Sequence, residues 1–240
     1  MTLSPRLSTV ANLVTQGHKI ADIGTDHAYI PIFLVKKKRI PHALAMDIRH
    51  GPLEIARENI KRAKLANHIE VRQSDGLKNL KAHEVDSIVV AGMGGNLTIK
   101  ILSENWQVTR QIKECILQPQ SDIEEVRTFL VDKGFTFIKE EMVEDAGKYY
   151  PMMKVTPPHT SKTNSDKAMV CERWSELELK FGKLLLKRKN PTLKRFLSKE
   201  LTIKEKILEK LEQEDGKHIK KRKKEILEEM ELIKAGLFHF

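Results

Sequence analysis

Two carboxylates flank a single glycine near the start of the chain, where a short apolar run ends. Asp22, Gly24 and Asp26 lie in this stretch, and a second apolar segment begins three residues later. A strand, a tight loop and the first turn of a helix form the unit that opens nucleotide-binding α/β domains. A dinucleotide site favours Gly-x-Gly-x-x-Gly, because bare backbone N–H groups must approach a pyrophosphate. This loop has one glycine and two carboxylates, which would repel a diphosphate.

The negative charge of the loop favours a cationic ligand. S-adenosylmethionine carries a sulfonium and an ammonium group against one carboxylate, so a loop with Asp22 and Asp26 suits it better than NAD. The loop therefore predicts a methyl donor. Two roles stay open for Asp26: it supports the positive charge of a methylated product, or it holds the ammonium group of the donor.

Two further carboxylates follow predicted strands. Asp47 lies 25 residues after Asp22, at a position where an acidic side chain accepts hydrogen bonds from ribose hydroxyls. Its alternative role is to cap the helix predicted from Gly51. Asp75 follows the next strand and is expected to accept from the adenine amine, with Gly76 leaving space for the ring, although Asp-Gly is also a common turn dipeptide.

The remaining candidates each have a structural alternative. Residues 91–95 read Ala-Gly-Met-Gly-Gly, and such glycines either let the backbone approach a ligand or form a flexible turn. His27 either contacts the donor or makes a hydrogen bond at the start of a helix. Tyr29, Tyr149 and Tyr150 either stack on a target base or pack in the core.

The elements that must position these residues alternate along the chain. Strands are predicted at 18–23, 42–46, 69–72, 86–90 and 114–117, and helices at 4–15, 29–37, 51–66, 96–102 and 121–133, the last with Ser121 as its cap and Gly134 as its stop. A β pair is predicted at 135–143 and 149–155. This alternation indicates a mostly parallel sheet covered on both faces. The trailing β pair is typical of a Rossmann-like methyltransferase sheet.

The composition changes after the β pair. We expect a methyltransferase domain over 1–158, a polar and proline-containing linker over 159–165, and a basic helical domain over 166–240. The helical part has apolar residues at heptad spacing on both sides of a turn, which predicts an antiparallel coiled-coil hairpin.

The net charge of +10 is uneven. Residues 161–240 hold 21 Lys/Arg and 14 Asp/Glu, whereas the first 160 hold 22 and 19. This excess in the helical part favours a polyanionic partner, with nucleic acid ahead of membrane, over an ordinary solvated face. No apolar run approaches the roughly 18 residues of a membrane span, and the first residues lack a signal-peptide core. We expect a cytoplasmic monomer that binds no membrane and, without matching ligands, no metal.

Several motifs in this order closely resemble the bacterial tRNA (adenine-N1)-methyltransferases that modify adenine 22. The motifs lie at residues 3–7, 22–31, 47, 74–77, 91–95, 118–120 and 148–150. The resemblance spans roughly residues 3–155 and continues loosely into the helical part. It implies a Rossmann-like α/β catalytic domain, a C-terminal helical coiled-coil domain, S-adenosylmethionine as the methyl donor and the D-arm region of tRNA as the substrate.

With the resemblance, the candidate residues fall into three groups. The predicted catalytic residues are Asp26 and Tyr29. The predicted donor-binding residues are Asp22, Gly24, Thr25, His27, Asp47, Asp75, Gly76, Gly92 and Met93. The predicted substrate-binding residues are Arg6, Gly94, Gly95, Gln118, Tyr149 and Tyr150.

The implied reaction needs orientation more than proton transfer. Adenine N1 is neutral with a free lone pair, so it can attack the methyl group directly, and the product is a cation. Because N1 lies on the pairing edge, the nucleotide must be exposed or flipped out. The alternatives are a methyltransferase for another RNA or a small molecule, and a non-catalytic RNA-binding adaptor with the same fold. The Asn/Asp-Pro-Pro-Tyr/Phe motif is absent, which weighs against methylation of exocyclic amines.

Overall fold

The computed structural model describes residues 2–158, 173–213 and 216–240. The chain divides into two compact units, Met1–Arg173 and Trp174–Phe240. The predicted linker, 159–165, lies outside the described residues, and the predicted domain bounds remain predictions. Among the described residues, no helix has the length and apolar character needed to cross a membrane.

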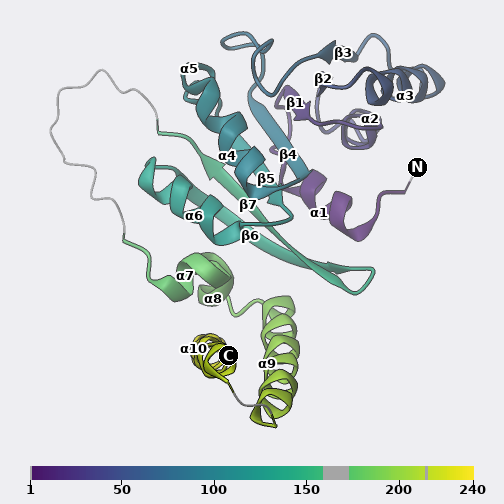
Figure 1. The fold of residues 1–240 in the computed structure, drawn as a ribbon. Coiled ribbons are helices and arrows are strands. Elements are labelled where there is room, and N and C mark those ends of the chain that lie inside the picture. The colour runs from purple at the N-terminus through teal and green to yellow at the C-terminus, as the bar shows by residue number, and fades with distance from the viewer. Residues whose placement is uncertain (1, 159–172, 214–215) are drawn as a thin grey trace, which may run out of the picture. The chain divides into compact units, whose positions relative to one another are not determined.

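The first unit alternates strands and helices as the apolar pattern predicts (Figure 1). Its strands are β1 (Ile20–Ile23), β2 (Ala43–Asp47), β3 (Ile69–Gln73), β4 (Ser87–Met93), β5 (Glu114–Pro119), β6 (Thr136–Asp145) and β7 (Lys148–Thr156). Its helices are α1 (Pro5–Leu13), α2 (Tyr29–Lys36), α3 (His50–Arg62), α4 (Gly95–Glu104), α5 (Trp106–Thr109) and α6 (Ile123–Asp132).

The seven strands form one sheet in the order β3-β2-β1-β4-β5-β7-β6. β1 to β5 pair in parallel, and β7 pairs antiparallel with both β5 and β6. The predicted α/β class with a trailing β pair is therefore confirmed. Because β1 to β5 are parallel, their carboxyl ends meet at one edge of the sheet, where ligands bind in open α/β folds.

Each face of the sheet has its own hydrophobic core, because neighbouring strand residues point to opposite sides. In β1, Ile20 packs with α1, α2 and α3, whereas Ala21 and Ile23 pack with the helices of the other face. Figure 1 shows α4 and α6 together on that second face. All four residues of β1 are buried, which is typical of a central strand in a parallel sheet covered on both sides.

Two predicted details of the first unit are wrong. Ser121 does not cap α6: the cap position is Asp122, which has a left-handed backbone (φ 50°) and makes no side-chain capping bond. The Ser121 hydroxyl instead donates to Asp122 Oδ2 at 2.8 Å. β4 also continues to Met93, because Ala91 and Met93 still pair with β5 across an irregularity at Gly92.

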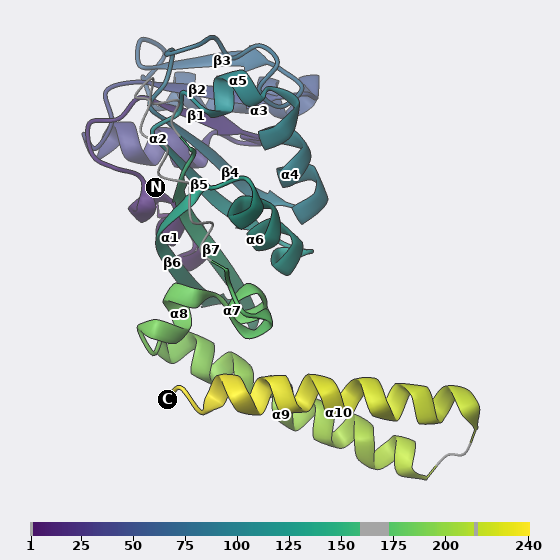
Figure 2. The same ribbon diagram turned by 90° about the vertical axis from the view of Figure 1, so that its left-hand side faces the viewer.

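The second unit is helical. It contains α7 (Glu176–Phe181), α8 (Lys183–Lys187), α9 (Pro191–Glu212) and α10 (Lys217–Leu237). α9 and α10 run side by side (Figure 2). They are antiparallel, since Leu197 lies beside Gly236 while Lys204, two turns later in α9, pairs with Glu229, two turns earlier in α10. The predicted turn between the two helices includes 214–215, which lie outside the described residues.

Candidate active site

A cavity of about 550 Å³ opens at the carboxyl ends of β1, β2 and β4. Its predicted lining residues are Arg6, Asp22, Gly24, Thr25, Asp26, His27, Tyr29, Asp47, Gly92 and Met93. Three carboxylates, two from the strands β1 and β2 and one from the loop after β1, therefore line one cavity. A volume of this size suits a nucleoside-sized ligand.

Asp22 is the buried carboxylate of the cavity. Thr25 Oγ1 donates a hydrogen bond of 2.7 Å to Asp22 Oδ2. Burial raises the pKa of Asp22 to about 7, the Thr25 bond opposes the shift, and the charge of Asp47 adds to it. Without a cationic partner, the carboxyl is therefore about half protonated at pH 7. A ligand that brings a positive charge would restore its ionised form.

The loop after β1 needs a glycine at one position. Gly24 has φ 73°, and a Cβ added there would overlap Met93 Cε. The N–H groups of Gly24 and Thr25 donate to Met46 O at 2.7 and 2.9 Å, which ties the loop to the end of β2. The backbone here can thus approach a ligand that lies between the ends of β1 and β2.

Two non-glycine residues in the same loop have left-handed backbones. Asp26 has φ 49° and Ala28 has φ 56°. Such conformations are costly for residues with a Cβ and concentrate at active sites, where the geometry serves a ligand. The Asp26 side chain is 58% exposed, and its Oδ2 lies 3.2 Å from His27 Nε2. The left-handed backbone at Asp26 thus places its exposed carboxylate in the open part of the cavity.

His27 and Tyr29 form an aromatic pair at the cavity wall. Their ring centroids are 5.0 Å apart with an interplanar angle of 21°. His27 Nδ1 is buried and has no hydrogen-bond partner among the described residues. Buried polar atoms are normally paired, so this nitrogen is available to a bound ligand. The observation fits the prediction that His27 contacts the donor.

Asp47 has the environment expected of a ribose ligand. Its side chain is buried, and Oδ1 accepts from the Arg49 N–H at 2.8 Å. Oδ2 forms no hydrogen bond within the described part of the chain and is left for a ligand. The alternative role, a cap for α3, is wrong: the cap position is Arg49, and no side chain caps this helix.

Arg6 reaches the cavity from α1 and is held by residues from three other segments. Its Nη1 donates to Gln118 Oε1 at 2.7 Å, its guanidinium lies 5.5 Å from the centre of the Tyr150 ring, and its backbone N–H donates to Asp145 Oδ2 at 3.1 Å. Gln118 is fully buried. Gln118 and Tyr150 therefore do not line the cavity; they orient the residue that does.

Five further predicted site residues, besides Gln118 and Tyr150, lie outside the lining. Asp75 forms a salt bridge with Lys78, whose hydrogen bond lowers the pKa of Asp75. Gly76 has a left-handed backbone, and a Cβ added there would lie 3.3 Å from Ile101 Cγ1. Gly95 has a packing role, because a Cβ there would lie 2.5 Å from the Ser121 carbonyl oxygen. Gly94 and Tyr149 do not line the cavity either, and all five roles remain predictions.

Five lining residues were not predicted from the sequence. They are Leu7, Ile30, Arg49, Ala91 and Gln120. Arg49 follows the predicted ribose ligand by two residues, and Gln120 follows the end of β5, so their positions at the carboxyl edge were a usable signal. Leu7 and Ile30 lie within the motifs at 3–7 and 22–31, but apolar helix residues are expected in the core, so neither was assigned to the site.

The sheet order and the acidic cavity at its carboxyl edge define the class of Rossmann-like methyltransferases. A family model described as "Methyltransferase domain" matches residues 3–153, more than half of the chain.

Full-length relatives narrow the class to one family. The chain is 32% identical to the tRNA (adenine(22)-N(1))-methyltransferase of Bacillus subtilis, over 100% of this chain and 98% of the relative. A Streptococcus pneumoniae structure in complex with S-adenosyl-L-methionine has a TM-score of 0.83 at 30% identity, covering 98% of this chain and 100% of the other. Mycoplasma capricolum TrmK, in complex with S-adenosyl-homocysteine, has a TM-score of 0.80 at 28% identity, covering 100% and 99%.

The chain belongs to the tRNA (adenine(22)-N(1))-methyltransferase family. The resemblance drawn from the sequence motifs is confirmed, and so is the classification as an S-adenosylmethionine-dependent methyltransferase.

Proposed function

We propose that this protein transfers a methyl group from S-adenosylmethionine to N1 of adenine 22 in the D-arm region of tRNA. The observation that carries the proposal is one cavity with three carboxylates, Asp22, Asp26 and Asp47, at the carboxyl edge of the sheet of a full-length family member. The adaptor alternative required a degraded donor site, and the cavity keeps all three carboxylates and Gly24.

Different residues of the cavity contact different groups of the donor. S-adenosylmethionine supplies the electrophilic methyl group when it is bound. Asp47 Oδ2 is free to accept from ribose hydroxyls, and buried Asp22 balances positive charge once it is ionised. Among the described residues, His27 Nδ1 is a buried polar atom of this cavity without a hydrogen-bond partner, and a donor or acceptor group of the ligand would satisfy it. The left-handed Gly24 and Gly92 leave the backbone open on both sides of the cavity.

Asp26 and Tyr29 serve the acceptor. Positive charge moves from the sulfur to the adenine ring during transfer, so a carboxylate on the acceptor side gains attraction as the reaction proceeds. Asp26 is the exposed carboxylate of the cavity and takes this role, rather than that of a strong base, because neutral N1 needs no deprotonation. The Tyr29 ring, stacked on His27, offers a face to the methylated adenine cation.

Arg6 and the helical unit bind RNA phosphates. Arg6 is pre-oriented by Gln118 and Tyr150 at the rim of the cavity, where it can hold the phosphate of the flipped nucleotide. The first turns of α10 carry Lys217, Lys220, Lys221, Lys223 and Lys224, a density of charge that favours backbone contacts. The protein acts as a monomer in the cytoplasm.

Incubation with unmodified tRNA and labelled S-adenosylmethionine tests the proposal. Mass spectrometry of nuclease fragments is expected to place one methyl group on N1 of adenine 22. A tRNA with guanine at position 22 is the control and is expected to remain unlabelled. Label on another atom or another nucleotide would overturn the assignment.

A further inference from the structure

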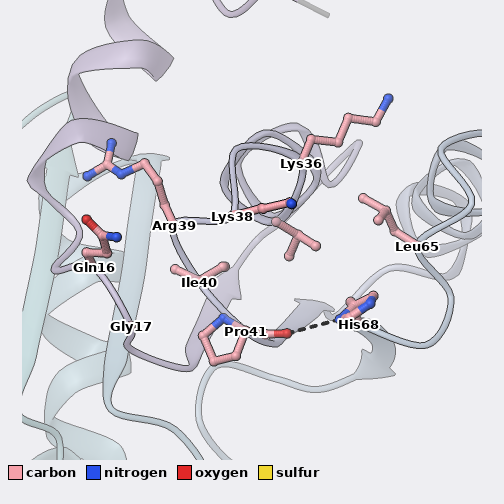
Figure 3. Close-up of a pocket in the computed structure, with 10 residues that line it drawn as sticks. Gln16, Gly17, Lys36, Lys38, Arg39, Ile40, Pro41, Leu65 and His68 are labelled. Carbon is pink, nitrogen blue, oxygen red and sulfur yellow. Dashed lines mark hydrogen bonds between the residues drawn. The ribbon is translucent and has the colours of Figure 1, made fainter.

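A second cavity, of about 660 Å³, lies at the opposite edge of the sheet (Figure 3). It shares no residue with the donor cavity. Its lining comes from residues 16–17 before β1, from the end of α2 and the segment that follows it, and from residues 65 and 68 before β3. All three segments are at the amino ends of parallel strands, so this cavity cannot be an extension of the donor site.

The cavity has an apolar floor and a basic rim. Val35, Ile40, Pro41 and Leu65 supply the apolar side chains. In Figure 3, Leu65 and His68 lie across the space from the end of α2. His68 Nδ1 donates to Pro41 O at 3.2 Å, which leaves its Nε2 available. A volume within the range of small-ligand pockets, with few polar groups around an apolar floor, suits a flat ring with a negatively charged substituent.

The two segments that flank the cavity contain cations and no carboxylate. Residues 27–46 and 59–69 together hold seven Lys/Arg and no Asp or Glu. Arg39 is engaged by α1, donating to Asn12 Oδ1 and Val14 O, and Arg62 pairs with Glu58. The other five cations form no salt bridge among the described residues. They are Lys36, Lys37, Lys38, Lys61 and Lys64, and we call them the amino-edge lysines.

Two amino-edge lysines occupy backbone positions that favour glycine. α2, α3 and α6 all end in the same arrangement, in which the N–H groups of the two residues after the cap donate back to the last turn. The left-handed residue is Gly134 (φ 76°) after α6, but Lys38 (φ 56°) after α2 and Lys64 (φ 60°) after α3. A residue with a Cβ is strained there.

The helix dipole does not account for these two lysines. A cation near the carboxyl end of a helix is favoured, but it does not need the left-handed position. α6 shows this, because Lys133 precedes Gly134 and supplies the charge while glycine takes the turn. Lys189 takes the same left-handed position after α8 in the helical unit, so this position does not by itself assign a partner. The two lysines beside the cavity differ from it because the segments that carry them contain no carboxylate, which points to an external anionic partner for their ammonium groups.

We propose that the amino-edge lysines bind backbone phosphates of the tRNA and that the cavity receives one unpaired nucleotide of the same strand, remote from adenine 22. This inference rests on the proposed function for the identity of the polyanion. Five lysines without a salt bridge among the described residues match a chain of phosphates better than a single anion. An unpaired base has a flat apolar face for the floor, and its flanking phosphates reach the rim.

The decisive variant is Lys38→Gly with Lys64→Gly, because binding and stability should change in opposite directions. Removing two left-handed side chains is expected to raise the melting temperature. Losing two phosphate contacts is expected to weaken tRNA binding about tenfold and to reduce the slope of log affinity against log salt by about 1.4 to 1.8. Donor affinity and turnover at saturating tRNA are expected to stay at the wild-type values.

Lys133→Gly is the matched control, with the same chemical change at the end of α6. It is expected to leave tRNA affinity and its salt slope within twofold of wild type. If the double variant binds tRNA as the wild type does, with the same salt slope, the lysine contacts are refuted. If the wild-type protein itself fails to bind or methylate tRNA, the proposed function fails instead.

Leu65→Trp tests the cavity separately. A half-buried Leu65 lines the space, so an indole there is expected to fill it. We expect weaker tRNA binding by at least threefold with an unchanged salt slope, because no charge is lost, and an unchanged donor affinity. Wild-type tRNA affinity in a folded Leu65→Trp protein would refute the nucleotide pocket.

Discussion

Asp22 and Glu114 are buried carboxylates near the carboxyl and the amino ends of the parallel strands, respectively. Their surroundings shift their pKa values in opposite directions. Burial raises the pKa of Asp22 to about 7, and within the described part of the chain Thr25 alone donates to its side chain. Burial also opposes the ionisation of Glu114, but Lys154 at 2.7 Å and two donors from Thr15 outweigh it and lower the pKa.

The difference separates a binding site from a structural site. Glu114 has its counter-charge inside the protein, so its ionised form belongs to the folded state. Asp22 lacks one and is set up to receive it from a ligand. The comparison extends to the two cavities. The donor cavity is lined by three carboxylates together with Arg6 and Arg49, whereas the cavity at the amino edge is lined by Lys36, Lys38 and Arg39 and by no carboxylate among the described residues.

Glu114→Gln is expected to have the largest effect on stability. The change leaves the largely buried Lys154 without its carboxylate, and breaking a buried pair in this way costs about 3 kcal/mol. Chemical denaturation measures the loss, while calorimetry is expected to show the wild-type donor affinity in the variant that remains folded. A parallel loss of donor affinity would contradict the separation of the two edges.

Asp26→Ala is expected to lower kcat about 100-fold, the scale found when one preorganised electrostatic contact to a transition state is removed. Donor affinity, measured by calorimetry, is expected to change less than threefold. Asp26→Asn keeps the size of the side chain and is expected to be nearly as slow. The alternative role, holding the donor's ammonium group, would instead appear as weaker donor binding.

Gly24→Ala and Gly17→Ala separate backbone strain from ligand binding. Both glycines are left-handed, with φ 73° and 85°. Each substitution is expected to cost about 1 to 2 kcal/mol of stability. A Cβ at Gly24 also meets Met93 in the donor cavity, whereas a Cβ at Gly17 meets nothing within 4 Å. Only Gly24→Ala is therefore expected to weaken donor binding. Equal donor affinities of the two variants would contradict a role of Gly24 in the donor site.

Donor affinity is expected to increase with pH through the titration of Asp22. Its folded pKa of about 7 lies above the ordinary value of 3.8, so the ionised form is scarce at low pH and gains population as pH rises. Between pH 6 and pH 7 the ionised fraction grows from about a tenth to about a half, which predicts roughly fivefold tighter binding. Asp22→Asn is expected to bind weakly with no such pH dependence; a flat wild-type profile would contradict the role.

Much of the active site was predictable because parallel strands bring distant loops together. Once β1, β2 and β4 are recognised, their carboxyl ends must meet, and Asp22, Asp26, Asp47 and Gly92 must share one edge. The pattern does not show which side chains pair with one another. Asp75 also follows a strand, and the structure adds its salt bridge with Lys78, three residues later, while its role in donor binding stays a prediction. Ser121 is of a residue type that often caps helices, yet Asp122 occupies the cap position of α6.

The sequence by itself determined the alternation of elements, the acidic loop and the family, since these depend on local patterns and on motifs in order. Only the tertiary structure decided how Arg6 is held, because its partner Gln118 is 112 residues away. It also decided that the cations after α2 and α3 flank one cavity. Contacts between remote segments depend on packing geometry, which no local pattern of residues encodes.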